Sequence, residues 1–212
     1  MIDIIVAIRK MCEPKSGFID MFDKNKSYDK LFELASNKQD AQLFAKLIYG
    51  RARENLIKLI KHACEYQKYT ESILSDLVLH DLSLPEAKRA LEIFLRAFGF
   101  TGYRDIQINP LNQFTCYEKG DFKCVYVGET KDGKEYGFGV RNNYFEGKSC
   151  GFDRCTWING RMLGYCYSLE VEFGAYKTNK YGFVLNDTFV GEYMTEYEDG
   201  EKAYMKGENL PL

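Results

Sequence analysis

The sequence lacks the long apolar run that a membrane-spanning helix requires. The N-terminal segment has only a short apolar stretch, Ile4 to Ala7, which cannot form a membrane span or the apolar core of a signal peptide. No other segment approaches about 18 uninterrupted apolar residues, the length at which a membrane span is suspected. We therefore expect a soluble, cytoplasmic protein without a membrane span.

An excess of charge of one sign is also absent. The chain has 29 lysine and arginine residues and 31 acidic residues, which gives a formal net charge of -2. Proteins that bind nucleic acids or acidic membranes normally present a strongly basic field, and this composition does not provide one. The composition therefore predicts that no nucleic acid is a partner.

Histidine is scarce, and the cysteines show no metal-binding pattern. The two histidines, His62 and His80, both lie in segments that we expect to be helical. His62 and Cys64 could supply two metal ligands, but residues two apart on a helix do not share a face. The 7 cysteines include no C-x2-C pair, so they fit reduced thiols better than a disulfide framework or a zinc site. We predict no metal site.

Motifs for nucleotide cofactors are incomplete. Residues 136–139 contain a G-x-G pattern, but the third glycine and the following helix of a dinucleotide loop are missing, as is the G-K-[ST] ending of a phosphate-binding loop. No histidine in the second half could serve as a base for a cysteine nucleophile. We therefore predict no cofactor and no catalytic residue, and we expect a protein that is not an enzyme.

What the sequence does contain is a change of composition near residue 101. Of the 18 glycines, 15 lie after Phe100, and so do 12 of the 16 tyrosines. Glycine and aromatic residues in short repeated hairpins are typical of a sheet with an aromatic face. The change predicts a helical bundle at residues 1–100, a linker at residues 101–120 and a sheet domain at residues 121–212.

The first half has the periodicity of amphipathic helices. Apolar residues recur at spacings of three and four from residue 29 to residue 100. The clearest helix begins at Ser83, where Glu86 completes a capping box and Pro85 fits the first turn, and it ends before Gly99. The runs at residues 43–60 and 84–100 are similar to a helical adaptor region found beside effector or repeat modules in bacterial proteins.

The second half alternates short strands with hairpin turns. The dipeptides Asp132-Gly133, Asn159-Gly160 and Asp199-Gly200 are strong hairpin signals, because both central residues of a type I′ turn need positive φ. Hairpins at this density predict an antiparallel meander. The predicted fold class is therefore α+β, an N-terminal helical bundle followed by a C-terminal antiparallel β-meander.

The first hairpin resembles the MORN repeat, whose pattern runs from a tyrosine and a glycine through a DG-like turn to G-x-G. The residues that carry this pattern, and that we predict to be repeat positions, are Tyr126, Gly128, Gly133, Gly137, Gly139 and, in a later echo, Gly191. The resemblance implies an elongated curved sheet of hairpins that serves mainly as a scaffold or ligand-binding surface. The spacing of Gly128, Gly151 and Gly174 is 23 residues, close to the length of such a repeat.

The pattern also has a physical reason. A tyrosine can pack its ring over a bare glycine on a neighbouring strand while its hydroxyl stays in contact with water. Alternation places Tyr165, Tyr167, Leu169 and Val171 on one face of a strand, and we expect this apolar face to point inward. The tyrosines of that strand are therefore expected to be structural.

Aromatic residues that the core does not need are the candidate binding residues. If they line one concave face, their rings and hydroxyls suit a peptide, a nucleotide or another protein. The candidates are Tyr144, Trp157, Tyr176, Tyr181 and Tyr193.

The sequence favours a non-catalytic interaction or scaffold protein whose aromatic sheet binds a protein or peptide partner. One alternative is a small-ligand, nucleotide-like binding or sequestering protein in which the sheet and the bundle enclose a pocket. A cluster of arginines or lysines with tyrosines around that cavity would favour it. A second alternative is an enzyme whose site brings Asp153, Arg154 and Cys155 together with Glu170 in a cleft. Oligomeric state is left open.

Overall fold

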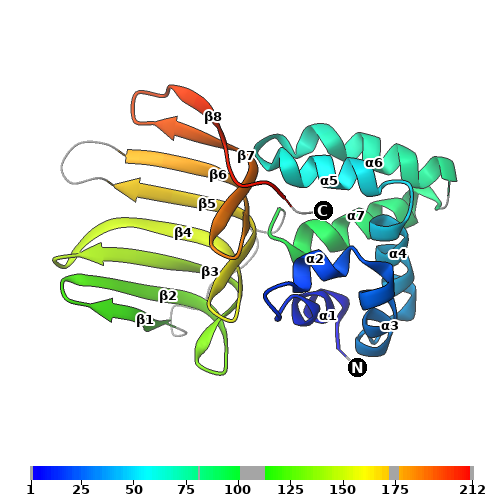
Figure 1. The fold of residues 1–212 in the computed structure, drawn as a ribbon, viewed down its shortest axis with the longest axis horizontal. Helices are drawn as coiled ribbons and strands as arrows, with labels where there is room; N and C mark the ends of the chain where they lie inside the picture. The colour runs from blue at the N-terminus through cyan, green and yellow to red at the C-terminus, as the bar shows by residue number, and fades with distance from the viewer. Residues whose placement is uncertain (1, 81, 101–112, 172–176, 211–212) are drawn as a thin grey trace. The chain divides into compact units, whose positions relative to one another are not determined.

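The computed structural model describes residues 2–80, 82–100, 113–171 and 177–210 (Figure 1). The chain divides into two compact units, Met1–Thr101 with Leu210–Leu212, and Gly102–Asn209. Helices make up the first unit and one antiparallel sheet makes up the second. The predicted α+β fold class is confirmed.

Seven α-helices and one 3-10 turn form in the described part of the first unit, and a short polar side chain caps several of their N-termini. They are α1 (Ile4–Met11), α2 (Gly17–Met21), α3 (Lys24–Leu34), α4 (Lys38–Tyr49), α5 (Arg53–Lys61), η1 (Ala63–Glu65), α6 (Gln67–His80) and α7 (Leu84–Ala97). Asp3, Asp23 and Asn37 accept hydrogen bonds from the first turns of α1, α3 and α4. The predicted cap of α7 is confirmed, since Glu86 accepts from the Ser83 N–H at 2.9 Å.

Aromatic rings fill the core of the helical unit. Phe18 and Phe98 meet edge to face with ring centroids 5.2 Å apart, and Phe94 packs 4.9 Å from Phe98. A bidentate ion pair joins α7 to α4, with Arg89 Nη2 at 2.8 Å from Asp40 Oδ2 and Nε at 3.1 Å from Oδ1. These contacts fix α4, which supplies one wall of the pocket described below.

The described part of the second unit contains eight strands, which form one sheet in which every strand pairs with its neighbour in the sequence. They are β1 (Gln113–Lys119), β2 (Phe122–Lys131), β3 (Lys134–Phe145), β4 (Lys148–Ile158), β5 (Arg161–Val171), β6 (Lys177–Leu185), β7 (Thr188–Tyr197) and β8 (Lys202–Lys206). All seven pairings are antiparallel, so the predicted meander is confirmed. Strand β1 lies within residues 101–120, which we expected to be a linker.

The hairpins repeat their geometry every 27 residues. Turn residues with positive φ stand at Asp132, Asn159 and Asn186. Glycines with positive φ at 137, 164 and 191 follow at the same interval, each opposite a shift in strand register. A bulge of this kind increases the local twist, so its recurrence twists the sheet at regular steps.

The expected spacing of 23 residues does not describe this repeat. Gly128 lies on a buried face of β2, and the equivalent positions one and two periods later are Cys155 and Gly182. Gly151 has a different environment, because a Cβ there would meet the Leu169 carbonyl. Gly174 lies outside the described residues. The spacing of the glycines did not predict the 27-residue period because the second of these equivalent positions holds Cys155 instead of a glycine.

Tyr126 shows how a ring and two glycines interlock. Its side chain is fully buried, and a Cβ at Gly128 would lie 2.5 Å from its hydroxyl oxygen; one at Gly139 would be closer still. The ring therefore packs over both glycines, as expected. The hydroxyl does not reach water, however, since it donates to the Tyr136 carbonyl at 3.1 Å in the buried interior.

Gly139→Ala should destabilise the sheet by about 1–3 kcal/mol, because the added methyl overlaps a ring that cannot move. Chemical denaturation of Gly139→Ala, Tyr126→Ala and the double variant measures the effect. We expect the double variant to lose about 1 kcal/mol less than the sum of the two single losses, since the overlap needs both groups. Strictly additive losses would contradict this packing.

Candidate functional site

The two faces of the sheet carry different side chains. Strand register and alternation place one set together, which we call the thiol face: Cys116, Cys124, Tyr126, Arg141, Asn143, Asp153, Cys155, Trp157, Cys166, Ser168 and Tyr193. The opposite surface, which we call the tyrosine face, carries Tyr144, Phe152, Arg154, Tyr165, Tyr167, Asn179, Tyr181, Met194 and Glu196. Side chains alternate along each strand, so no residue serves both faces.

The thiol face holds the core of the sheet. Trp157 is fully buried, and its indole N–H donates to the Gly139 carbonyl at 3.2 Å. The Tyr126 ring packs edge to face on Trp157, and the Arg141 guanidinium lies 4.1 Å above the centre of the indole. The predicted binding residue Trp157 therefore occupies a structural position and has no surface to offer a partner.

A buried ion pair holds Arg141 over the tryptophan. Its Nη2 lies 2.7 Å from Glu135 Oε1, and only 21% of the Arg141 side chain and 7% of the Glu135 side chain are exposed. Burial disfavours the charge on Arg141, but the hydrogen bonds to Glu135 and the nearby negative charges together outweigh burial and raise the pKa of Arg141. The ion pair fixes the strand β3 side of the core.

Three thiols of this face, those of Cys116, Cys124 and Cys166, are protonated at neutral pH. Burial, with a smaller contribution from Glu135, raises the pKa of Cys116 to about 12. Burial also raises the pKa of Cys124, and the hydrogen bond with Cys155 together with burial raises that of Cys166. A protonated, buried thiol is a poor nucleophile and a poor metal ligand. No group of three or more histidine, cysteine or acidic side chains within the described residues is arranged to hold a metal ion.

The residues proposed for an enzymatic site are divided between the two faces. Asp153, Cys155 and Glu170 lie on the thiol face, whereas Arg154 projects from the tyrosine face. The Asp153 carboxylate accepts from Ser168 at 2.7 Å and from Asn143 at 3.2 Å. Glu170 pairs with Lys180 at 2.6 Å. Arg154 therefore points away from the other three residues.

The tyrosine face carries a row of packed rings across three strands, which ends at a carboxylate on a fourth. Phe152 of β4 meets Tyr167 of β5 edge to face at 5.4 Å, and Tyr167 stacks on Tyr181 of β6 at 4.9 Å with planes 18° apart. The Tyr181 hydroxyl donates to Glu196 of β7 at 3.3 Å, and the Tyr167 hydroxyl donates to Asn179 at 3.0 Å. All five side chains are half-buried, so the row is both fixed and accessible.

Burial within this row raises the pKa of Tyr181 to about 12, with smaller contributions from Tyr167 and Glu196. Tyr181 is therefore a neutral hydroxyl over the whole physiological range. The row consequently offers aromatic surface and neutral hydroxyls, with one carboxylate at its end.

The other predicted binding residues do not join the row. Tyr144 lies on the same face, half-buried in β3. Tyr193 lies on the opposite face, where it stacks on Phe189 at 4.6 Å and covers Gly182. Tyr176 lies outside the described residues. The repeat residues Gly133, Gly137 and Gly191 have positive φ.

Strand β5 was assigned the wrong inward face. Its buried residues are Leu163, Gly164, Cys166 and Ser168, whereas Tyr165 and Tyr167 are half-exposed. The small side chains fit closely against the aromatic cluster of the thiol face, and the larger rings project to the other side. Tyr167 of the row was missed because apolar character was taken as the sign of burial.

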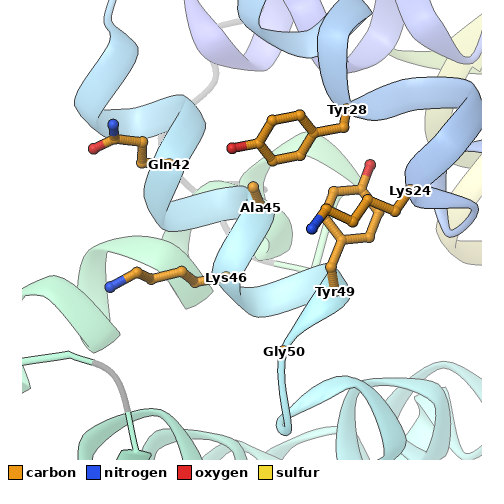
Figure 2. A pocket seen from close by; sticks show the side chains of 7 residues that line it. All are labelled: Lys24, Tyr28, Gln42, Ala45, Lys46, Tyr49 and Gly50. Carbon is orange, nitrogen blue, oxygen red and sulfur yellow. The ribbon is translucent and has the colours of Figure 1, made fainter.

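The helical unit contains an open pocket of about 540 Å³ between α3 and α4 (Figure 2). Its lining consists of Lys24, Tyr28, Gln42, Ala45, Lys46, Tyr49 and Gly50. This site was not predicted from the sequence. The helical spacing of its residues could have indicated it: Lys24 and Tyr28 are four residues apart, so they share one face of α3. The side chains of α4, Gln42, Lys46 and Tyr49, follow at spacings of four and three and also share a face.

Comparison with known proteins gives no match: no family model and no curated protein matches the chain. No helix among the described residues is long and apolar enough to cross a membrane. The functional proposals below therefore rest on the residues and geometry of the two units.

Glu135→Gln should lower the free energy of unfolding of the sheet by about 3 kcal/mol, because it leaves the charge of Arg141 buried without its partner. The fluorescence of Trp157, the sole tryptophan, reports this unfolding directly. Glu170→Gln is the matched control, since Glu170 is 51% exposed and its pair with Lys180 is worth less than about 1 kcal/mol. Equal losses in the two variants would show that the Arg141 pair is not part of the core.

Proposed function

We propose that this protein is a non-catalytic interaction module whose tyrosine face binds a protein or peptide partner. The observation that carries the proposal is the row Phe152, Tyr167 and Tyr181, which crosses β4 to β6 and ends at Glu196. Tyrosine supplies a large contact area and a hydrogen-bonding hydroxyl while losing little side-chain entropy, and for this reason it is enriched in protein interfaces.

The side chains of the row are fixed before a partner binds, which favours tight binding over binding that requires them to rearrange. Each ring is held by its neighbour, and each tyrosine hydroxyl already has an acceptor on the adjacent strand. A surface ordered in advance does not lose further conformational entropy when a partner docks. The polar groups Asn179 and Glu196 border the rings, which matches the usual plan of an apolar centre with a polar rim.

The repeated hairpins support a MORN-like scaffold as the architecture of this module. Three features of the MORN pattern, a tyrosine packed on two glycines, a DG turn and recurring bulge glycines, have a structural role in β2 and β3. The 27-residue geometric repeat extends this plan to β7. We place the protein in the cytoplasm, where its seven cysteines would remain reduced.

A small-ligand function is the second candidate, and the pocket between α3 and α4 favours it. This pocket has the lysines and tyrosines that such a function needs, although all of its lining residues belong to the helical unit and none to the sheet. The two candidates are compatible because they use different surfaces.

Replacing Tyr167 and Tyr181 by serine should remove partner binding while the fold remains intact. Proteins that copurify with the full chain are first identified, and their affinity for the purified wild type and variants is then measured by titration. We expect at least a tenfold loss of affinity in the double variant, because two central aromatic contacts are worth more than about 1.4 kcal/mol.

Tyr197→Ser is the matched control, since Tyr197 is 40% exposed but lies on the opposite face in β7. It should bind within a factor of two of the wild type. If the control loses affinity and the double variant does not, the tyrosine face is not the binding surface. The Trp157 emission of each variant confirms that the sheet remains folded.

A further inference from the structure

We propose that the pocket between α3 and α4 binds a phosphate-bearing small molecule with a flat ring, of the nucleoside monophosphate class. This site lies in the helical unit and is independent of the tyrosine face. The proposal rests on the shape of the pocket, on the charges at its rim and on the two aromatic side chains in its wall.

The pocket exists because small residues stand where the two helices could otherwise meet. Ala45 is 5% exposed and contributes only a methyl group, and Gly50 ends α4 without a side chain. Figure 2 shows the longer side chains of α3 and α4 arranged around Ala45. The volume of about 540 Å³ lies in the range of small-ligand sites, which is roughly 300–1,000 Å³.

The charge at the pocket is positive. Lys24 of α3 and Lys46 of α4 both line it, and its lining contains no carboxylate. Both lysines are exposed, and ammonium groups of this kind can donate hydrogen bonds to a dianionic phosphate that the charges strengthen. The Gln42 amide, one turn from Lys46 on the same face of α4, adds a neutral donor and acceptor.

Acidic groups near the pocket have other partners. Hydrogen bonds from Ser83 lower the pKa of Glu86, and Lys46 adds a smaller lowering. Asp23 caps α3 through the Asn25 N–H at 3.0 Å. Neither carboxylate lines the pocket.

Two tyrosines form an aromatic wall of the pocket. Tyr28 and Tyr49 are both half-buried, with centroids 6.0 Å apart and planes inclined by 49°. Tyr49 is held in place because its hydroxyl and that of Ser27 lie 2.6 Å apart. Lys24 lies over the Tyr28 ring at 5.3 Å, which places a cation beside the aromatic wall. An anion without a ring would contact only the lysines, whereas a nucleotide would contact the lysines through its phosphate and the tyrosines through its base.

Isothermal titration of the full chain with adenosine and guanosine monophosphates tests the proposal, with inorganic phosphate and adenosine as separate probes. We expect the monophosphates to bind at least tenfold more tightly than either fragment. Because each lysine would lose a charge-assisted hydrogen bond to the phosphate, Lys24→Ala and Lys46→Ala should each weaken binding about tenfold or more. Ala45→Leu should also abolish binding because it fills the pocket without changing any charge.

Lys58→Ala is the charge-matched control, because Lys58 is exposed on α5 and does not line the pocket. It should bind the monophosphates within a factor of two of the wild type. If the monophosphates do not bind, or if Lys24→Ala and Lys46→Ala bind them as the wild type does, the proposal is wrong. Phosphate binding as tightly as a monophosphate, or adenosine binding as tightly, would equally overturn it. Because the lysines are exposed, their variants remain folded and decide the matter even if Ala45→Leu does not fold.

Discussion

The sheet depends on the packing of aromatic rings against glycines on neighbouring strands. Its eight strands form one sheet, and its buried cluster is built from Tyr126, Cys155, Trp157, Cys166 and Val184 of that sheet itself. Tyr126 can lie flat over β3 only because Gly128 and Gly139 have no side chains. The same relation recurs at the other end of the cluster, where Gly182 leaves room for Tyr193 and Phe189.

This packing also explains the two different faces. Where glycine, cysteine and serine line the thiol face, as at positions 164, 166 and 168 of β5, the rings of neighbouring strands approach closely and exclude water. The bulky residues of the same strand must then project from the opposite side. The tyrosine face is thus a consequence of how the core is filled, and the aromatic row stands on a surface that the core makes rigid.

Much of the fold follows from local signals in the sequence. The capping box at Ser83 and the turns at Asp132-Gly133 and Asn159-Gly160 need only a few neighbouring residues, and the structure contains all of them. Burial in β5 could not be read this way, because it depends on which neighbours cover each face. The turn at Asn186 was missed because it lacks the glycine of the other two. Strand β1 was not predicted because only its pairing with β2 identifies it as a strand.

The candidate sites were harder to predict than the fold because residue type does not separate structural from binding aromatics. Trp157 and Tyr181 have the same chemical reasons to bind a partner, yet the first is fully buried under Arg141 and the second is half-exposed beside Glu196. Only the register of the strands distinguishes them. The helical pocket shows the converse: Lys24, Tyr28 and Lys46 look like ordinary surface residues in the sequence, and they become a site only because α3 and α4 pack with Ala45 between them. Binding chemistry here is a property of small residues as much as of large ones, since glycine and alanine create the spaces and surfaces that rings and ammonium groups then line.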